Sequence, residues 1–325
     1  MKTAMKNLVS LALLGAGLLL SACAAPGEPF RSGTMQGYDF ADFTAARPGD
    51  LTLEGRLVLP ENAAPRAAII LSHGAGGTGS RQDTAAAMFA EAGWAALILD
   101  HFGARGVRSV ASDQIRVSEQ QMASDIFEAR DALAARLNMD PSQIGAAGWS
   151  KGATAVTLAS VERLQAMLAP NAEPLAFAAV FYPFCGFQLD EEELASPLLM
   201  LLAGEDDWTP SAPCVRQADA WRAAGQPVSV MVYPDAEHGF DSSAGRFEVG
   251  RAITVRDTTA RCTLQVDEAG RTVTVDQANS IATPEARGAF LEVCGERGVT
   301  FAGDADSGRD ARARLLAFAD QAIAD

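Results

Sequence analysis

The sequence Gly148-Trp149-Ser150-Lys151-Gly152 decides the fold of this 325-residue chain. An apolar run at residues 143–147 precedes it, and a run of small residues at 153–160 follows it. A G-x-S-x-G segment between a strand and a helix is typical of the nucleophile elbow, a sharp turn that exposes the serine hydroxyl at the edge of a sheet. In isolation such a segment can also be a Gly-rich turn with a capping serine, so the downstream sequence must decide between the two interpretations.

Two later segments supply the partners of a nucleophilic serine, in the order Ser, Asp, His. Residues 197–203, PLLMLLA, form an apolar run of buried-strand length that ends in the sequence GEDDW at 204–208. Residues 228–233, VSVMVY, predict another strand, and His238 follows it. We therefore predict Ser150 as the nucleophile and His238 as its base, with an acid from the loop after residue 203.

Asp206 and Asp207 are both candidates for that acid, because they are adjacent in the loop. Counting forward from Gly204 in a G-x-x-D pattern selects Asp207, whereas counting back four residues from Pro210 selects Asp206. Proline fixes the backbone where the following helix begins, while a glycine turn can absorb a one-residue deletion. We therefore predict Asp206 as the acid and keep Asp207 as the alternative.

The oxyanion hole is expected to use two backbone N–H groups. One is that of Lys151, the residue after the nucleophile, and the other comes from a loop after an early strand. Residues 67–72 predict that strand, and the glycine-rich sequence HGAGG follows it at 73–77. Ala75 or Gly74 is the expected second donor, because glycines there let the backbone approach a substrate carbonyl.

Six segments of the chain, in this order, resemble the dienelactone hydrolase family of α/β-hydrolases. They are LSHGAGG (71–77), LDHFGARGV (99–107), GWSKG (148–152), FYPFCG (181–186), GEDDWTPSAPC (204–214) and YPDAEHGFD (233–241), and the resemblance covers about residues 50–245 and the last helix. Several founding members of the family have cysteine at the elbow, whereas this chain has Ser150 and resembles its serine branch. The resemblance implies a hydrolase of carboxylic esters or lactones that needs no cofactor, since Ser and Cys elbows share one base and oxyanion chemistry.

Predicted strands and helices alternate along the chain. The expected strands are 51–59, 67–72, 95–100, 177–181, 197–203 and 228–233, and the expected helices are 84–92, 118–137, 211–224 and 307–323. This alternation of apolar strands with helices predicts an α/β fold with a mostly parallel central sheet and helices on both faces. The active site is then expected at the carboxyl ends of the strands.

The N-terminus predicts export. Lys2 and Lys6 precede an apolar run at residues 8–20, and small residues lead from this run to Cys23. The segment resembles a bacterial lipoprotein signal, whose cleavage leaves Cys23 as the lipid-bearing N-terminus; an ordinary secretory signal is the alternative. Because Ala24 follows the cysteine, the resemblance implies a lipid anchor in the outer membrane, facing the periplasm.

The expected domain organisation is a signal peptide at 1–22, a tether at 23–45 and a hydrolase domain at 46–325. Residues from about 245 to 305 do not fit the minimal fold and are expected to form an insertion, with a hairpin at 261–275 and a helix at 284–297. This insertion is either a structural decoration or part of the substrate mouth.

Export also bears on the cysteines, because disulfides persist in oxidising compartments. Apart from Cys23 the chain has four, an even number that allows three pairings. Cys185 follows a predicted core strand and Cys214 follows the acid loop, and neighbouring strand ends would bring the two together. We therefore favour the pairs Cys185–Cys214 and Cys262–Cys294.

The formal net charge of −15 argues against nucleic acid as a partner. No metal site is expected, because no cysteine pair has zinc spacing. The chain has two histidines in addition to His238. These residues, His73 and His101, are expected to stabilise the scaffold by hydrogen bonding. The expected partners are a small ester or lactone and, through the lipid, a membrane. The alternatives are a catalytically silent, lipid-anchored binding protein and a peptidase or thioesterase of the same fold.

Overall fold

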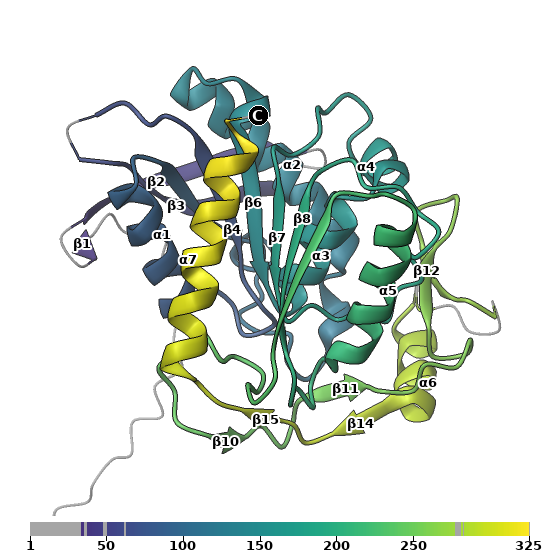
Figure 1. The fold of residues 1–325 in the computed structure, drawn as a ribbon. Coiled ribbons are helices and arrows are strands. Elements are labelled where there is room, and N and C mark those ends of the chain that lie inside the picture. The colour runs from purple at the N-terminus through teal and green to yellow at the C-terminus, as the bar shows by residue number, and fades with distance from the viewer. Residues whose placement is uncertain are drawn as a thin grey trace, which may run out of the picture.

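The computed structural model describes residues 34–35, 38–47, 51–61, 63–276, 281 and 283–324. The predicted signal peptide and Cys23 lie outside these residues. A nine-stranded sheet forms the centre of the described part, with the strand order β1-β2-β3-β5-β4-β6-β7-β8-β9 (Figure 1). None of the described helices combines the length and the hydropathy needed to cross a membrane.

The sheet is parallel over two thirds of its width. Its strands are β1 Thr34–Met35, β2 Tyr38–Arg47, β3 Leu51–Val58, β4 Ala68–Ser72, β5 Ala95–Asp100, β6 Ile144–Trp149, β7 Ala178–Phe181, β8 Leu198–Ala203 and β9 Val228–Tyr233. Neighbours from β5 to β9 pair in parallel, whereas β1, β2 and β3 pair antiparallel and β3 joins β5 antiparallel. The predicted fold class is confirmed.

Helices cover both faces of the sheet. They are α1 Ser80–Glu91, α2 Glu119–Leu137, α3 Lys151–Ala159, α4 Glu162–Leu168, α5 Ser211–Ala223 and α7 Ala305–Ala322, whereas α6 Pro284–Cys294 belongs to the insertion. The central strands are buried on both sides, so alternate residues face two cores: Ile70 belongs to the core that includes α2, α3 and α5, and Ile69 belongs to the core that includes α1 and α7. Figure 1 shows α1 and α7 together on the near face.

Local signals set the ends of the longest helix, α2. The side chain of Ser118 accepts a hydrogen bond from the Gln121 N–H, and the Ser118 N–H donates to Gln121 Oε1, which forms a capping box. Asn138 ends the helix in the left-handed conformation, with φ 50°. The helix therefore occupies almost the whole of the predicted span.

Strand β2 corrects the predicted tether. It pairs antiparallel with β3 over residues 40–47, and it buries the side chains of Phe43 and Ala45. Residues 38–45 therefore belong to the sheet, and the folded domain begins before residue 46. The alternation of Phe43 and Ala45 with polar residues is the strand signal that the tether interpretation overlooked.

The insertion forms three small sheets and one helix beyond the carboxyl ends of the parallel strands (Figure 1). The pairs are β10 Phe247–Glu248 with β15 Thr300–Phe301, β11 Ile253–Val255 with β14 Gly295–Arg297, and β12 Leu264–Val266 with β13 Thr272–Thr274. The β12–β13 pair is the predicted hairpin. The predicted helix ends at Cys294 instead of residue 297, because residues 295–297 pair with β11.

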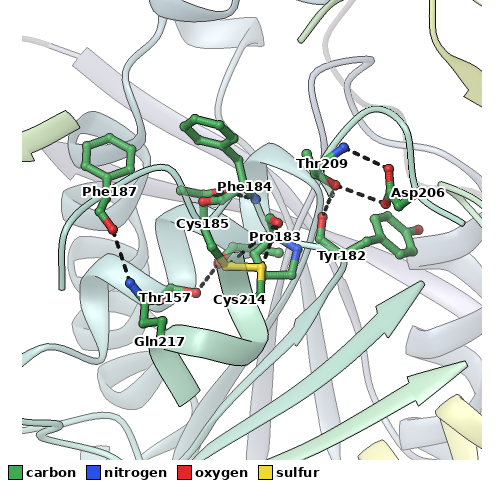
Figure 2. Close-up of a disulfide and its surroundings, with 12 residues drawn as sticks. Thr157, Tyr182, Pro183, Phe184, Cys185, Phe187, Asp206, Thr209, Cys214 and Gln217 are labelled. Atoms are coloured by element: carbon green, nitrogen blue, oxygen red, sulfur yellow. Dashed lines mark hydrogen bonds between the residues drawn. A yellow bond between two sulfur atoms is a disulfide. The ribbon is translucent and has the colours of Figure 1, made fainter. Parts of the chain in front are cut away.

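Both predicted disulfides are present. Cys185, after β7, is bonded to Cys214 in α5, with a Cα–Cα distance of 5.1 Å (Figure 2). Cys262, before β12, is bonded to Cys294 at the end of α6, with a Cα–Cα distance of 5.6 Å. The first disulfide lies beside the acid loop, and the second ties the two halves of the insertion together.

Candidate active site

Ser150 lies on a strained turn between β6 and α3, with φ 54° and ψ −119°. Both glycines of the motif are required there: a Cβ at Gly148 would lie 2.4 Å from the Gly152 carbonyl oxygen, and one at Gly152 would lie 2.4 Å from the His73 carbonyl oxygen. A non-glycine residue in such a conformation costs about 1–3 kcal/mol and persists only where its surroundings enforce it. The turn has the geometry of a nucleophile elbow.

His238 joins Ser150 to Asp206. Its Nε2 lies 3.0 Å from Ser150 Oγ, and its Nδ1 lies 2.8 Å from Asp206 Oδ2. A carboxylate only accepts hydrogen bonds, so Nδ1 carries the proton and Nε2 is free to accept the one on the serine hydroxyl. All three side chains are buried, and they come from the elbow, from the loop after β8 and from the loop after β9.

The orientation of the Asp206 carboxylate is fixed by its own loop. Oδ1 accepts hydrogen bonds from the backbone N–H groups of Trp208 and Thr209, at 2.9 and 2.7 Å. The Thr209 hydroxyl lies 3.0 Å from both Oδ2 and the Tyr182 carbonyl oxygen (Figure 2). These contacts leave Oδ2 directed at the imidazole of His238.

Asp207 faces the insertion instead. It accepts hydrogen bonds from the Thr300 N–H at 2.7 Å and from the Thr300 hydroxyl at 3.0 Å. Its neighbour Trp208 donates from Nε1 to the Ile253 carbonyl at 3.2 Å and accepts from the Thr254 hydroxyl at 2.6 Å. The structure therefore places Asp206 beside His238, and it uses Asp207 to attach the insertion to the acid loop.

The two loops that carry the expected oxyanion donors meet at Ser150. Lys151 is the first residue of α3, so its N–H has no acceptor within the helix. A Cβ built on Gly74 would lie 3.3 Å from Ser150 Cβ. The carbonyl of Ala75 is fixed by hydrogen bonds from the Val110 N–H and the Ser109 hydroxyl. The geometry thus brings the Gly74–Ala75 loop and Lys151 to the nucleophile.

The Lys151 side chain turns away from the elbow. Burial lowers the pKa of its ammonium, although the Glu119 carboxylate, with Oε1 at 2.5 Å from Nζ, raises it in part. An ammonium this deeply buried is retained only with such a partner.

His73 and His101 are structural in the described part of the chain. Nδ1 of His73 lies 2.8 Å from the Gly74 carbonyl oxygen, and its Nε2 accepts the His101 N–H at 3.1 Å. His101 joins Ser72 Oγ to Asp125 Oδ2, with both distances 2.9 Å. This second Ser-His-Asp relay is fully buried, and burial lowers the pKa of His101. It holds the early loops and is closed to substrate.

Sequence reasoning missed a buried network beneath His238. The ring centroid of Tyr182 lies 4.6 Å from that of His238, and its hydroxyl donates to Asp241 Oδ1 at 2.5 Å. Trp149 Nε1 donates to Asp241 Oδ2 at 2.6 Å. Burial, followed by the charge of Asp241, raises the pKa of Tyr182 well above its usual value. Asp241 stands three residues after His238, and this spacing was its only signal in the sequence.

The chain itself supplies a hydroxyl, an imidazole and a carboxylate at this site. Across residues 63–276 and the other described ranges, no three His, Cys, Asp or Glu side chains gather as metal ligands. The serine, imidazole, carboxylate and free N–H groups together can attack a carbonyl carbon, transfer the proton and stabilise the oxyanion.

Comparison with known proteins identifies the family. The model of the dienelactone hydrolase family matches residues 53–262. An uncharacterized protein of Mycobacterium tuberculosis is 29% identical over 184 residues, which span 53% of this chain and 62% of that protein.

The fold recurs in solved structures. Native esterase 2 of Thermogutta terrifontis superposes with a TM-score of 0.50 at 20% identity, covering 62% of this chain and 83% of its own. The same esterase phosphorylated by paraoxon gives a TM-score of 0.50 at 21% identity, covering 63% and 86%. At this identity the likeness concerns the fold alone. The chain therefore has the α/β-hydrolase fold and, by the match to its family model, belongs to the dienelactone hydrolase family.

Proposed function

We propose that this chain is a serine hydrolase of the cell envelope that cleaves carboxylic esters or lactones through an acyl-enzyme on Ser150. One observation carries the proposal: Ser150, His238 and Asp206 form a hydrogen-bonded relay at the end of a strained elbow. Membership of the dienelactone hydrolase family supports the same class of reaction.

In the acylation step, Ser150 Oγ attacks the ester carbonyl carbon and His238 Nε2 takes the serine proton. Asp206 accepts the Nδ1 hydrogen bond and stabilises the imidazolium that forms. The N–H of Lys151, with that of Ala75 or Gly74, holds the negative oxygen. His238 then returns the proton to the departing alcohol as its bond to the acyl carbon breaks.

In the deacylation step, His238 takes a proton from a water molecule as that water attacks the acyl carbon. The bond to Ser150 Oγ breaks, the serine recovers its proton from His238, and the acid product leaves. Every group used in the two steps belongs to the chain or the substrate, and the reaction consumes one water.

The proposed location rests on the sequence of residues 1–23, which resembles a lipoprotein signal, and on two features compatible with it. The two disulfides are of the kind that persists outside the reducing cytosol. The described part of the sheet begins with β1 at Thr34, so only residues 24–33 separate Cys23 from the sheet. We propose a lipid on Cys23 and an outer-membrane anchor facing the periplasm.

Active-site labelling tests the proposed nucleophile. Purified protein should react with a fluorophosphonate, and Ser150→Ala should abolish both the labelling and ester hydrolysis, with a loss on the order of 10⁶ in rate. Paraoxon is a second probe, because it phosphorylates the esterase of Thermogutta terrifontis. A catalytically silent binding protein would not react with either probe.

Ser72→Ala is the matched control, because Ser72 also contacts a histidine that is bonded to an aspartate. It should retain labelling, since its hydroxyl is inaccessible. Labelling that survives in Ser150→Ala, or disappears only in Ser72→Ala, would overturn the assignment.

A further inference from the structure

An apolar cavity of about 70 Å³ lies between the acid loop and the insertion. The core of the fold contributes Phe184 and Phe187 to its lining, and the acid loop contributes Trp208. The insertion contributes Ile253, Phe290 and Leu291. Figure 2 shows the rings of Phe184 and Phe187 beside the Cys185–Cys214 disulfide. The cavity thus has one wall from the segments that follow the strands of the central sheet and one from the insertion.

Three residues that line the cavity are connected to the reacting groups by ring contacts, hydrogen bonds or an ion pair. Trp208 lies against the imidazole of His238, with ring centroids 4.7 Å apart. The Phe184 N–H donates to Thr154 Oγ1 at 2.9 Å, and the Thr154 N–H donates to the Ser150 carbonyl at 3.0 Å. Glu119, a polar lining residue, is paired with the ammonium of the residue after Ser150. The cavity lining therefore contacts His238 at Trp208 and at Thr209, whose hydroxyl lies 3.1 Å from His238 Nδ1.

The cavity is held in shape by covalent and backbone links. The Cys185–Cys214 disulfide ties the segment that carries the two phenylalanines to α5, and Cys262–Cys294 closes the insertion. Between the two parts, the Leu264 N–H donates to the Gly186 carbonyl and the Gln188 N–H donates to the Leu264 carbonyl, each at 2.8 Å. A pocket fixed in this way is already organised before a ligand enters.

We propose that this cavity binds the acyl chain of the ester, with the insertion as its outer wall, and that it selects short acyl groups. This inference rests on the proposed function. An engineered apolar cavity of about 150 Å³ accommodates the six carbons of benzene. A cavity of about 70 Å³ then holds roughly three carbons beyond the carbonyl, which corresponds to a butyryl group.

A chain-length series of p-nitrophenyl esters tests the proposal. Each methylene that leaves water is expected to raise kcat/KM about fourfold, so the butyrate should exceed the acetate by roughly 15-fold. Esters of eight carbons or more should fall again, because the chain outgrows the cavity. Leu291→Trp should lower the butyrate-to-acetate ratio at least tenfold by filling the cavity. Leu291→Ala should move the optimum toward hexanoate.

Val293→Trp is the matched control, because Val293 lies on the same helix and is 55% exposed. It should keep the wild-type ratio. The proposal is overturned if both Leu291 variants keep that ratio, or if Val293→Trp changes it as much. The two Leu291 variants act in opposite directions, so one that fails to fold still leaves the other as a test. Failure of the proposed function would look different: no p-nitrophenyl ester would be hydrolysed and fluorophosphonate would not label the wild type.

Discussion

The exchange of one oxygen for a nitrogen at Asp206 should disable the site without unfolding it. Oδ1 accepts two backbone N–H bonds, from Trp208 and Thr209. In Asp206→Asn the amide oxygen must stay at that position, because an NH₂ group there would face two donors. The NH₂ group is therefore forced toward His238 Nδ1, which must then accept, so that Nε2 carries the proton.

An imidazole in that tautomer cannot take the proton of Ser150. The expected loss in kcat is on the order of 10⁴, or about 5 kcal/mol of transition-state stabilisation. The hydrogen bonds from the backbone N–H groups are retained, so the free energy of unfolding should change by only about 1 kcal/mol. The assay is kcat for p-nitrophenyl butyrate, together with denaturant unfolding of each variant.

Asp207→Asn is the control one residue away. Its side chain can still accept the Thr300 N–H, which now bonds to Oδ1 at 2.7 Å. We expect kcat within about tenfold of wild type, because a buried hydrogen bond to the insertion is weakened but no proton transfer is affected. If Asp207→Asn were the slower variant, or the two were equal, the assignment of the acid would be refuted.

Three further predictions follow from contacts outside the reacting groups. Ser72→Ala should lower the free energy of unfolding, measured with denaturant, by about 1–3 kcal/mol, because it leaves the buried His101 Nε2 without a hydrogen-bond donor. An unchanged unfolding midpoint would contradict the buried Ser72–His101–Asp125 relay. Burial raises the pKa of Asp125, but its bonds to His101 and Arg105 prevail and set it below its ordinary value of 3.8. The stability from this carboxylate is therefore present above pH 3.8 and is lost as the pH falls through the lower pKa of the folded state. Asp125→Asn should flatten the acid limb of a curve of unfolding free energy against pH. An equally steep limb in this variant would count against the reasoning. Metabolic palmitate labelling should mark the full-length protein, whereas Cys23→Ser should release it from membranes or block its processing; an unlabelled, soluble wild type would indicate plain secretion.

Sequence alone predicted the segments of the site because each has a local signature. The elbow needs glycine at 148 and 152 for steric reasons that any such turn imposes. His238 and Asp206 follow strands whose apolar runs are easy to recognise, and parallel strands bring their carboxyl ends to one edge. The choice of Asp206 over Asp207 also agreed with the observed contact between Asp206 and His238.

The features that escaped prediction depend on contacts between distant residues. The relay through Asp125 joins a strand end to the middle of a helix, and nothing near Ser72 in the sequence indicates that partner. Strand β2 has a local alternation at Phe43 and Ala45, but this pattern is short, and its pairing with β3 is visible only in the fold. The end of α6 was misplaced for a similar reason, since residues 295–297 gain a partner strand only in three dimensions.

The acid loop divides its consecutive residues between two tasks, and this limits how the enzyme can be re-engineered. Asp206 serves the histidine, while Asp207 and Trp208 hold the insertion through Thr300, Ile253 and Thr254. Deleting the insertion would remove the four hydrogen bonds that join Asp207 and Trp208 to Thr300, Ile253 and Thr254, so a shortened enzyme should lose rate as well as selectivity. Exchanges on the outward side of α6, such as at Val293, leave those anchors untouched. Mutant libraries aimed at new substrates should therefore vary the side chains that line the cavity and keep the hydrogen bonds of Asp207 and Trp208 to the insertion.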